Sequence, residues 1–186
     1  AQAVGVTILG WNEWGLRIHS ALAAVLWVLA VWSFARREWD ETTGWVAGVL
    51  TATSLWVIVI GRAATADALL NLFLALTLFD LYGFWKENRK PALYRVFLWS
   101  ALGFLTKGPI AVAIPLAAAF LLALVRGRPV RYLRAVLNPV GWIIFFGVAG
   151  PWYAAVYARD GQAFIDGFFL SHNLNRFAAT MGGHGG

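Results

Sequence analysis

The residues that could do chemistry are few, and they lie in short segments far apart in the chain. They are acids, bases, amides and histidines, which can exchange protons and bind anions in a protein site. Because ionisable groups are costly at membrane depth, such residues usually face a protein-lined or water-filled cavity. The candidates are Asn12, Glu13, Arg17 and His19, then Arg62 and Asp67, then Lys107, and finally His172, Asn173, Asn175, Arg176 and His184.

Each of these residues also has a purely structural interpretation. Glu13 and Arg17 are four residues apart, so they can pair on one face of an interfacial helix. Arg62 and Asp67 can close a tight turn between two helices. Lys107 can extend its amine to the membrane interface. No single residue is therefore specific, and only the way the apolar segments bring them together can distinguish the two interpretations.

The composition indicates the class of protein. Of the 186 residues, 60% are hydrophobic and only 13% are charged, and the mean hydropathy is +0.67. A soluble domain carries about a quarter charged residues, so this chain has too few to cover a water-exposed surface. The chain has no Cys, which excludes a disulfide-stapled secreted domain. These features exclude a soluble enzyme or a disordered tail and indicate an integral membrane protein.

Six apolar segments are long enough, or nearly so, to cross a bilayer as helices, for which about 20 residues are needed. We predict an all-α polytopic integral membrane protein with about six transmembrane helices and outer-face interfacial helices. Residues 1–15 form an outer interfacial segment, residues 16–158 the six spans and residues 159–186 an outer tail. Asp80 is predicted to be helix-terminal. The spans are Leu16–Ala35, Gly44–Ile60, Ala66–Trp85, Leu93–Thr106, Gly108–Val125 and Pro139–Ala158.

The distribution of Lys and Arg predicts the orientation. Ten of the fifteen lie in the connections after the first, third and fifth spans, and five lie on the opposite side. Because cytoplasmic loops are rich in Lys and Arg, the ten face the cytoplasm and both chain ends lie outside. The basic excess is thus a topology signal, and nucleic acid is not an expected partner. All of the candidate residues then share the outer face, which predicts an extracytoplasmic polar cavity.

Four stretches together resemble a known family. They are GWNEWGLR at 10–17, GRAATAD at 61–67, GFLTKGP at 103–109, and a tail with PWY at 151–153 and FF and HNLNRF at 168–177. Their order is similar to that in the polytopic lipid-linked sugar transferases of the GT-C class. The most similar branch contains bacterial lipid A aminoarabinose transferases and protein O-mannosyltransferase-like proteins. The resemblance covers essentially the whole chain.

The resemblance implies transfer of a sugar from a polyprenyl-phosphate carrier to an acceptor at the outer face of the bacterial inner membrane. The acceptor is lipid A, a protein hydroxyl or another glycan. In the family, the chief catalytic Asp lies in the first outer loop. This chain starts at Ala1, without an initiator Met, and later than that loop. It is therefore expected to be a piece of a longer protein that lacks this Asp and is inactive alone.

The resemblance also implies roles for individual residues. Asp67 matches the second family Asp, which organises the site or binds the sugar, and it is the catalytic candidate. Glu13 and His172 match a Glu and a His that hold a metal ion, with zinc as the candidate. The substrate-binding and phosphate-binding candidates are Asn12, Arg17, Arg62, Lys107 and Arg176, with His184 as a further candidate site residue.

Two other classes of function remain open. A secondary transporter would use the charges as a substrate path and Pro115 as the hinge of a broken helix, although transporter sites usually lie near the midplane. A non-catalytic lipid-binding subunit would keep the same anion-binding residues and perform no chemistry.

Overall fold

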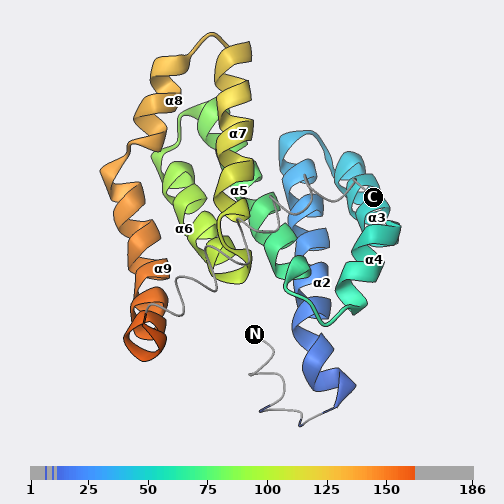
Figure 1. Cartoon of the computed structure of the whole chain (residues 1–186). Coiled ribbons are helices and arrows are strands. Elements are labelled where there is room, and N and C mark those ends of the chain that lie inside the picture. The colour runs from blue at the N-terminus through green and yellow to red at the C-terminus, as the bar shows by residue number, and fades with distance from the viewer. Residues whose placement is uncertain (1–6, 8–9, 11, 162–186) are drawn as a thin grey trace, which may run out of the picture. The chain divides into compact units, whose positions relative to one another are not determined.

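The computed structural model describes residue 7, residue 10 and residues 12–161, which form helices joined by short connections (Figure 1). No β-strand occurs among these residues, and the predicted all-α class is confirmed. The chain divides into two compact units, Ala1–Phe145 and Phe146–Gly186, and α9 begins in the first. The helices are α2 (Glu13–Glu38), α3 (Glu41–Thr53), α4 (Leu55–Arg62), α5 (Asp67–Glu87), α6 (Lys90–Lys107), α7 (Ile110–Val125), α8 (Pro129–Val136) and α9 (Pro139–Asp160).

Each predicted span is largely helical, but the number of membrane crossings stays a prediction. Within residues 12–161, three helices are long and apolar enough to cross a membrane, namely α2, α5 and the Pro139–Arg159 part of α9. Helices α3 and α4 meet the same criterion only as a bent pair, and α7 is a shorter apolar helix. Length and composition therefore support three or four spans in this part of the chain.

The second predicted span is broken at Ser54, where α3 and α4 meet at an angle of 57°. Ser54 has an extended backbone, and the turn before it carries two threonines. The Thr51 hydroxyl donates to the Ala47 carbonyl at 2.7 Å, and the Thr53 hydroxyl donates to the Val49 carbonyl at 2.8 Å. Such bonds to the carbonyl four residues back bend helices. The local hydroxyl cluster thus explains why this apolar segment is not one straight helix.

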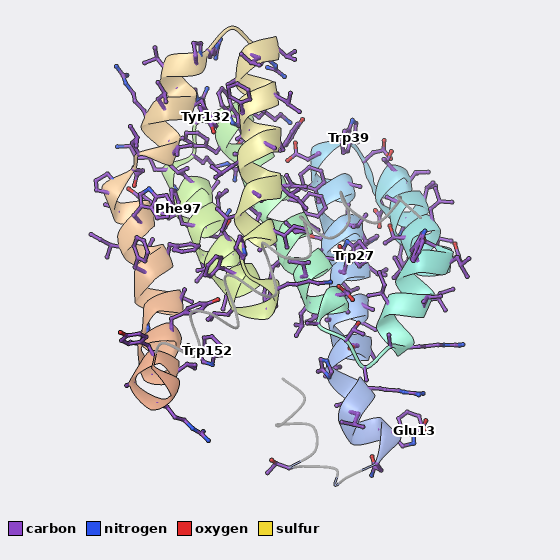
Figure 2. The ribbon with its side chains drawn as sticks, in the orientation of Figure 1. Glu13, Trp27, Trp39, Phe97, Tyr132 and Trp152 are labelled. Carbon is purple, nitrogen blue, oxygen red and sulfur yellow. The ribbon has the colours of Figure 1, made fainter. Side chains whose placement is uncertain are left out.

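Small residues bring the helices of the first unit together. Ala23 of α2 and Ala68 of α5 are 1% and 0% exposed, and they form a core with Leu72. Trp27 packs against this core (Figure 2). Close packing of small side chains is the usual way in which helices associate in a bilayer. Many large apolar side chains are exposed on the outside of the helices, as expected for contact with lipid. They include Leu22, Val25, Leu26, Leu29, Leu50, Leu55, Trp56 and Ile143.

Ion pairs join the long helices near the end opposite the start of α2. Lys86 of α5 donates to Glu38 of α2 at 2.7 Å, and the Glu38 side chain is only 3% exposed. Arg95 of α6 lies 2.5 Å from Asp80 of α5, and the Trp99 indole donates to the same carboxylate at 2.9 Å. The prediction that Asp80 is helix-terminal is wrong, because α5 extends beyond it. Asp80 instead connects α5 to α6.

Candidate functional site

Three chain connections lie at one end of the first unit. The long helices run in alternating directions, so the start of α2, the α4–α5 connection and the α6–α7 connection each lie at the lower ends of their helices in Figure 1. This places several sequence-predicted site residues at the same end, as the hydropathy pattern indicated. We call this the polar end, defined by Asn12, Glu13, Arg17, Arg62, Asp67 and Lys107.

Asp67 and Lys107 form an ion pair across 40 residues of sequence. Asp67 is the first residue of α5 and Lys107 is the last residue of α6. An acid at a helix start and a base at a helix end both interact favourably with the helix dipole. Gly108 ends α6 with a φ of 74°, a left-handed value that glycine adopts readily, and Pro109 follows. The structure therefore pairs Asp67 with Lys107, where the sequence had suggested Arg62.

The α4–α5 connection is fixed to α2 by a buried hydroxyl. Ser20 is 0% exposed, and its hydroxyl donates to the Thr65 carbonyl at 2.9 Å. The His19 Nε2 atom lies 3.3 Å from the same oxygen and 3.1 Å from the Ser20 hydroxyl. Sequence reasoning noted His19 as an outer polar residue but missed Ser20. The only feature of the sequence that could have indicated this contact is a small hydroxyl residue near the start of an apolar span. These contacts position both Arg62 and Asp67, which flank Thr65.

A groove of about 490 Å³ opens at the polar end between α2 and α4. Arg17 and Glu13 form an i,i+4 ion pair at 3.1 Å on its wall, with side chains 52% and 78% exposed. Arg62 lies on the opposite wall, and within residues 12–161 no carboxylate forms an ion pair with it. Arg62 is therefore an exposed cation available to an anion. The groove is lined by Glu13, Trp14, Arg17, Ile18, Ala21, Gly61 and Arg62.

A second, apolar groove of about 400 Å³ continues from the first along α2 and the bent α3–α4 pair. The two grooves share Ala21, Gly61 and Arg62. Gly61 permits a close approach here, because a Cβ at this position would lie 2.9 Å from the Ala24 Cβ. The remaining lining residues of the apolar groove are Ala24, Val25, Val28, Leu29, Ala52, Val57 and Ile58. The combined surface has cations at its mouth and aliphatic side chains along its length.

Asn12 has a structural position in addition to its predicted substrate role. Its side-chain oxygen accepts a hydrogen bond from the Gly15 amide at 2.7 Å, which makes it the N-cap of α2. A side-chain cap of this kind satisfies one of the free amides at a helix start. Asn12 thereby fixes where the first turn of α2, with Glu13, begins.

The predicted metal site depends on residues beyond those that the structure describes. His172, Arg176 and His184 lie outside the described residues. Within the described residues, no group of three or more His, Cys, Asp or Glu side chains could hold a metal ion. Glu13 is the one predicted ligand with a defined position, and its carboxylate already pairs with Arg17. The described residues alone therefore do not form a zinc site, for which three or four protein ligands are usual.

Known proteins resemble the chain along almost its whole length. The undecaprenyl phosphate-alpha-4-amino-4-deoxy-L-arabinose arabinosyl transferase of Pectobacterium atrosepticum is 28% identical over 182 residues, covering 95% of this chain and 32% of that protein. The protein of the same name from Aeromonas hydrophila is 30% identical over 196 residues, covering 98% and 34%. The chain thus spans about a third of the length of these relatives.

A solved structure shares the fold. The crystal structure of ArnT from Cupriavidus metallidurans bound to undecaprenyl phosphate superposes with a TM-score of 0.80 at 20% identity. The match covers 93% of this chain and 32% of that one. The polytopic membrane fold expected from the sequence is confirmed by this likeness.

The family match agrees with the order of the sequence motifs. The dolichyl-phosphate-mannose-protein mannosyltransferase family matches residues 1–153, which include the 10–17, 61–67 and 103–109 motifs. The resemblance to GT-C class polyprenyl-phosphate-sugar glycosyltransferases is thereby confirmed. The chain belongs to the dolichyl-phosphate-mannose-protein mannosyltransferase family.

Proposed function

We propose that the protein transfers a sugar from a polyprenyl-phosphate carrier to an acceptor at the extracytoplasmic face of a bacterial inner membrane. The acceptor classes are lipid A, a protein hydroxyl or a glycan. The names of the relatives, which refer to undecaprenyl phosphate-linked aminoarabinose, support the donor class. The positive-inside pattern supports an outward-facing polar end.

The observation that carries the proposal is the continuity of the two grooves. A polyprenyl phosphate has one anionic head and a long apolar tail. The surface between α2 and α4 offers matching chemistry, with Arg62 and Arg17 at the mouth and Val25, Val57 and Ile58 along its length. The head would bind at Arg62, and the tail would lie in the apolar groove, which is open to the bilayer.

The Asp67–Lys107 pair supplies the two charges that the transfer requires. In the reaction, the bond between the anomeric carbon and the phosphate oxygen breaks and a bond to the acceptor oxygen forms. Negative charge then accumulates on the leaving phosphate, where the Lys107 ammonium stabilises it. Asp67 organises the sugar and accepts a proton where the acceptor is a hydroxyl. The ion pair holds both side chains in place.

Zinc held by Glu13 and His172 remains part of the proposal, together with phosphate contacts from Arg176. A bound zinc ion would neutralise phosphate charge. No step of the proposed reaction uses it, because Glu13 is the one of its two predicted ligands that lies within the described residues.

The two alternatives are disfavoured on different grounds. A transporter site is expected near the midplane, whereas the ionisable residues of α2 lie toward its two ends and Asp67 is the first residue of α5. A non-catalytic lipid-binding subunit would use the same grooves, so only an activity assay separates it from the transferase.

Substitution of the ion pair tests the chemistry. We expect Asp67→Asn and Lys107→Met each to lower sugar transfer by the intact protein about a hundredfold or more, because a proton acceptor or a phosphate-stabilising charge is lost. The measurement is turnover with a polyprenyl-phosphate sugar donor in proteoliposomes. Asp40→Asn, which removes an exposed acid at the opposite end, is the matched control and should keep normal turnover.

The charge-reversed double variant Asp67→Lys/Lys107→Asp separates a structural role from a chemical one. It restores an ion pair at the same position and should recover part of the lost thermal stability, because the reversed charges oppose the helix dipoles, while turnover stays low. Recovery of turnover together with stability would contradict the chemical assignment.

A bulky side chain at the junction of the two grooves tests the lipid position. Ala21 lines both grooves, so Ala21→Trp should raise the KM for the lipid donor about tenfold or more with little change in kcat. The adjacent Leu22 is exposed and lines neither groove, so Leu22→Trp is the matched control. Equal KM values for the two variants would argue against a lipid in this groove.

Metal content tests the zinc proposal. The purified intact protein should contain zinc by elemental analysis, and Glu13→Gln and His172→Ala should each lower the bound zinc severalfold. A wild-type protein without zinc, or variants with an unchanged zinc content, would show that Glu13 and His172 are not zinc ligands.

A further inference from the structure

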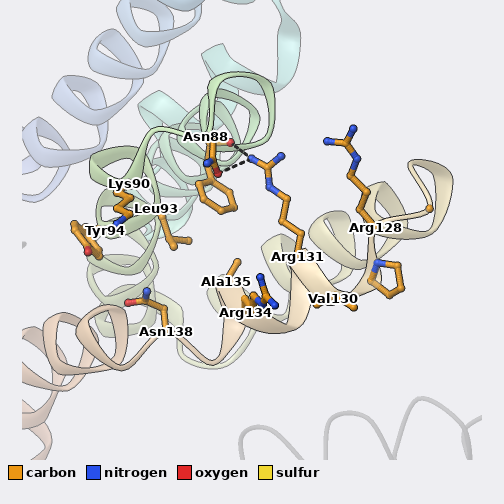
Figure 3. Close-up of a pocket in the computed structure, with 13 residues that line it drawn as sticks. Asn88, Lys90, Leu93, Tyr94, Arg128, Val130, Arg131, Arg134, Ala135 and Asn138 are labelled. Carbon is orange, nitrogen blue, oxygen red and sulfur yellow. Dashed lines mark hydrogen bonds between the residues drawn. The ribbon is translucent and has the colours of Figure 1, made fainter.

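A basic pocket lies at the end of the first unit opposite the polar end. It has a volume of about 830 Å³ and lies between the α5–α6 connection and α8 (Figure 3). Lys90 contributes from one wall, and Arg128, Arg131 and Arg134 contribute from the other. We call these four residues and the space between them the basic pocket. No acid lines it.

Within the described residues, the cations of the basic pocket differ from most of their neighbours because they have no acidic partners. Elsewhere at this end, Arg36, Arg37, Lys86, Arg89 and Arg95 each form an ion pair with Asp or Glu. Within residues 12–161, no such pair involves any of the four cations of the basic pocket. A topology signal alone requires only that Lys and Arg lie on this side of the membrane. It does not require unpaired cations to gather around one cavity.

Arg131 of the basic pocket contacts the end of α5 through hydrogen bonds and aromatic rings. Its Nη2 donates to the Phe84 carbonyl at 2.5 Å and to the Asn88 side-chain oxygen at 3.1 Å (Figure 3). The guanidinium also lies 4.9 and 4.8 Å from the ring centres of Phe84 and Trp85. Its Nε is buried and has no hydrogen-bond partner in the described part of the chain. Burial and the nearby Arg128 charge lower the pKa of Arg131, so an anion in the pocket would relieve an electrostatic cost.

Helix α8, which carries Arg131 and Arg134 and follows directly after Arg128, has the character of a membrane-surface helix. Alongside its arginines, α8 exposes Val130 and Leu133, which are 58% and 52% exposed. Leu137, the next residue after α8, is 69% exposed. A short helix with Arg on one side and exposed aliphatic residues on the other usually lies in the plane of the lipid headgroups. A ligand of the basic pocket would therefore have an anionic head next to apolar chains.

We propose that the basic pocket binds the phosphodiester headgroup of an anionic phospholipid, with its acyl chains against the exposed aliphatic residues of α8. Basic pockets between membrane helices bind such headgroups through charge complementarity. A free phosphate would match the cations but would leave the aliphatic rim without a partner. The bound lipid would fix α8 to the α5–α6 connection, and this site is separate from the polar end.

The test compares two double variants of equal net charge. The intact protein, purified in a neutral detergent, is titrated with phosphatidylglycerol or with zwitterionic phosphatidylethanolamine, and bound lipid is counted by native mass spectrometry. We expect wild-type protein to bind phosphatidylglycerol about tenfold more tightly than phosphatidylethanolamine. Arg128→Gln/Arg134→Gln should lose about tenfold in this affinity, since both side chains are exposed and line the pocket. Arg36→Gln/Arg126→Gln, which removes two cations of the same end outside the pocket, should lose less than twofold.

Lys90→Gln supplies a variant on a different helix and should also weaken phosphatidylglycerol binding. Equal loss in the two double variants would overturn the site, because any reduction in basic charge would then suffice. Equal binding of the two lipids by wild-type protein would overturn the headgroup assignment. Displacement of the lipid by millimolar inorganic phosphate would show a free-phosphate site instead.

Discussion

Helix α5 is joined to α6 by two ion pairs, Asp67 with Lys107 at its first residue and Asp80 with Arg95 in its second half. In an apolar environment, a charge without a partner is costly, so each pair restricts which faces of the two helices can meet. A hydrogen bond from the Ser20 hydroxyl to the Thr65 carbonyl also connects α2 to the residues just before α5. The turn that carries Arg62, and the groove between α2 and α4, depend on this arrangement.

The sequence predicted the helices and the grouping of the polar end for a clear physical reason. Apolar segments of sufficient length must form helices in a bilayer, because their backbone amides have no water to bond. Short connections then make successive helices antiparallel, so Glu13, Asp67 and Lys107 must lie at the same end. The spaced motifs around these residues also predicted the family, which the match over residues 1–153 confirms.

Other features depend on contacts that hydropathy does not encode. The break at Ser54 arises from threonine hydroxyls that bond to backbone carbonyls. Asp80 looked helix-terminal because it lies near the end of its apolar segment, and the sequence did not show that Arg95 on another helix is its partner. The basic residues around α8 counted only as a topology signal, since a charge count cannot tell which cations have acidic partners. The proposed roles of His172, Arg176 and His184 stay predictions, because these residues lie outside those that the structure describes.

The proposed function places a polyprenyl phosphate in the groove between α2 and the α3–α4 pair. Its most direct test is photo-crosslinking with a polyprenyl phosphate that carries a photoreactive group on its first isoprene units. After irradiation in membranes, mass spectrometry of the digested protein identifies the labelled residues. The account predicts labels on the groove residues of α2 and α4, such as Val25, Val57 and Ile58. Labels confined to α7 or α8 would contradict it.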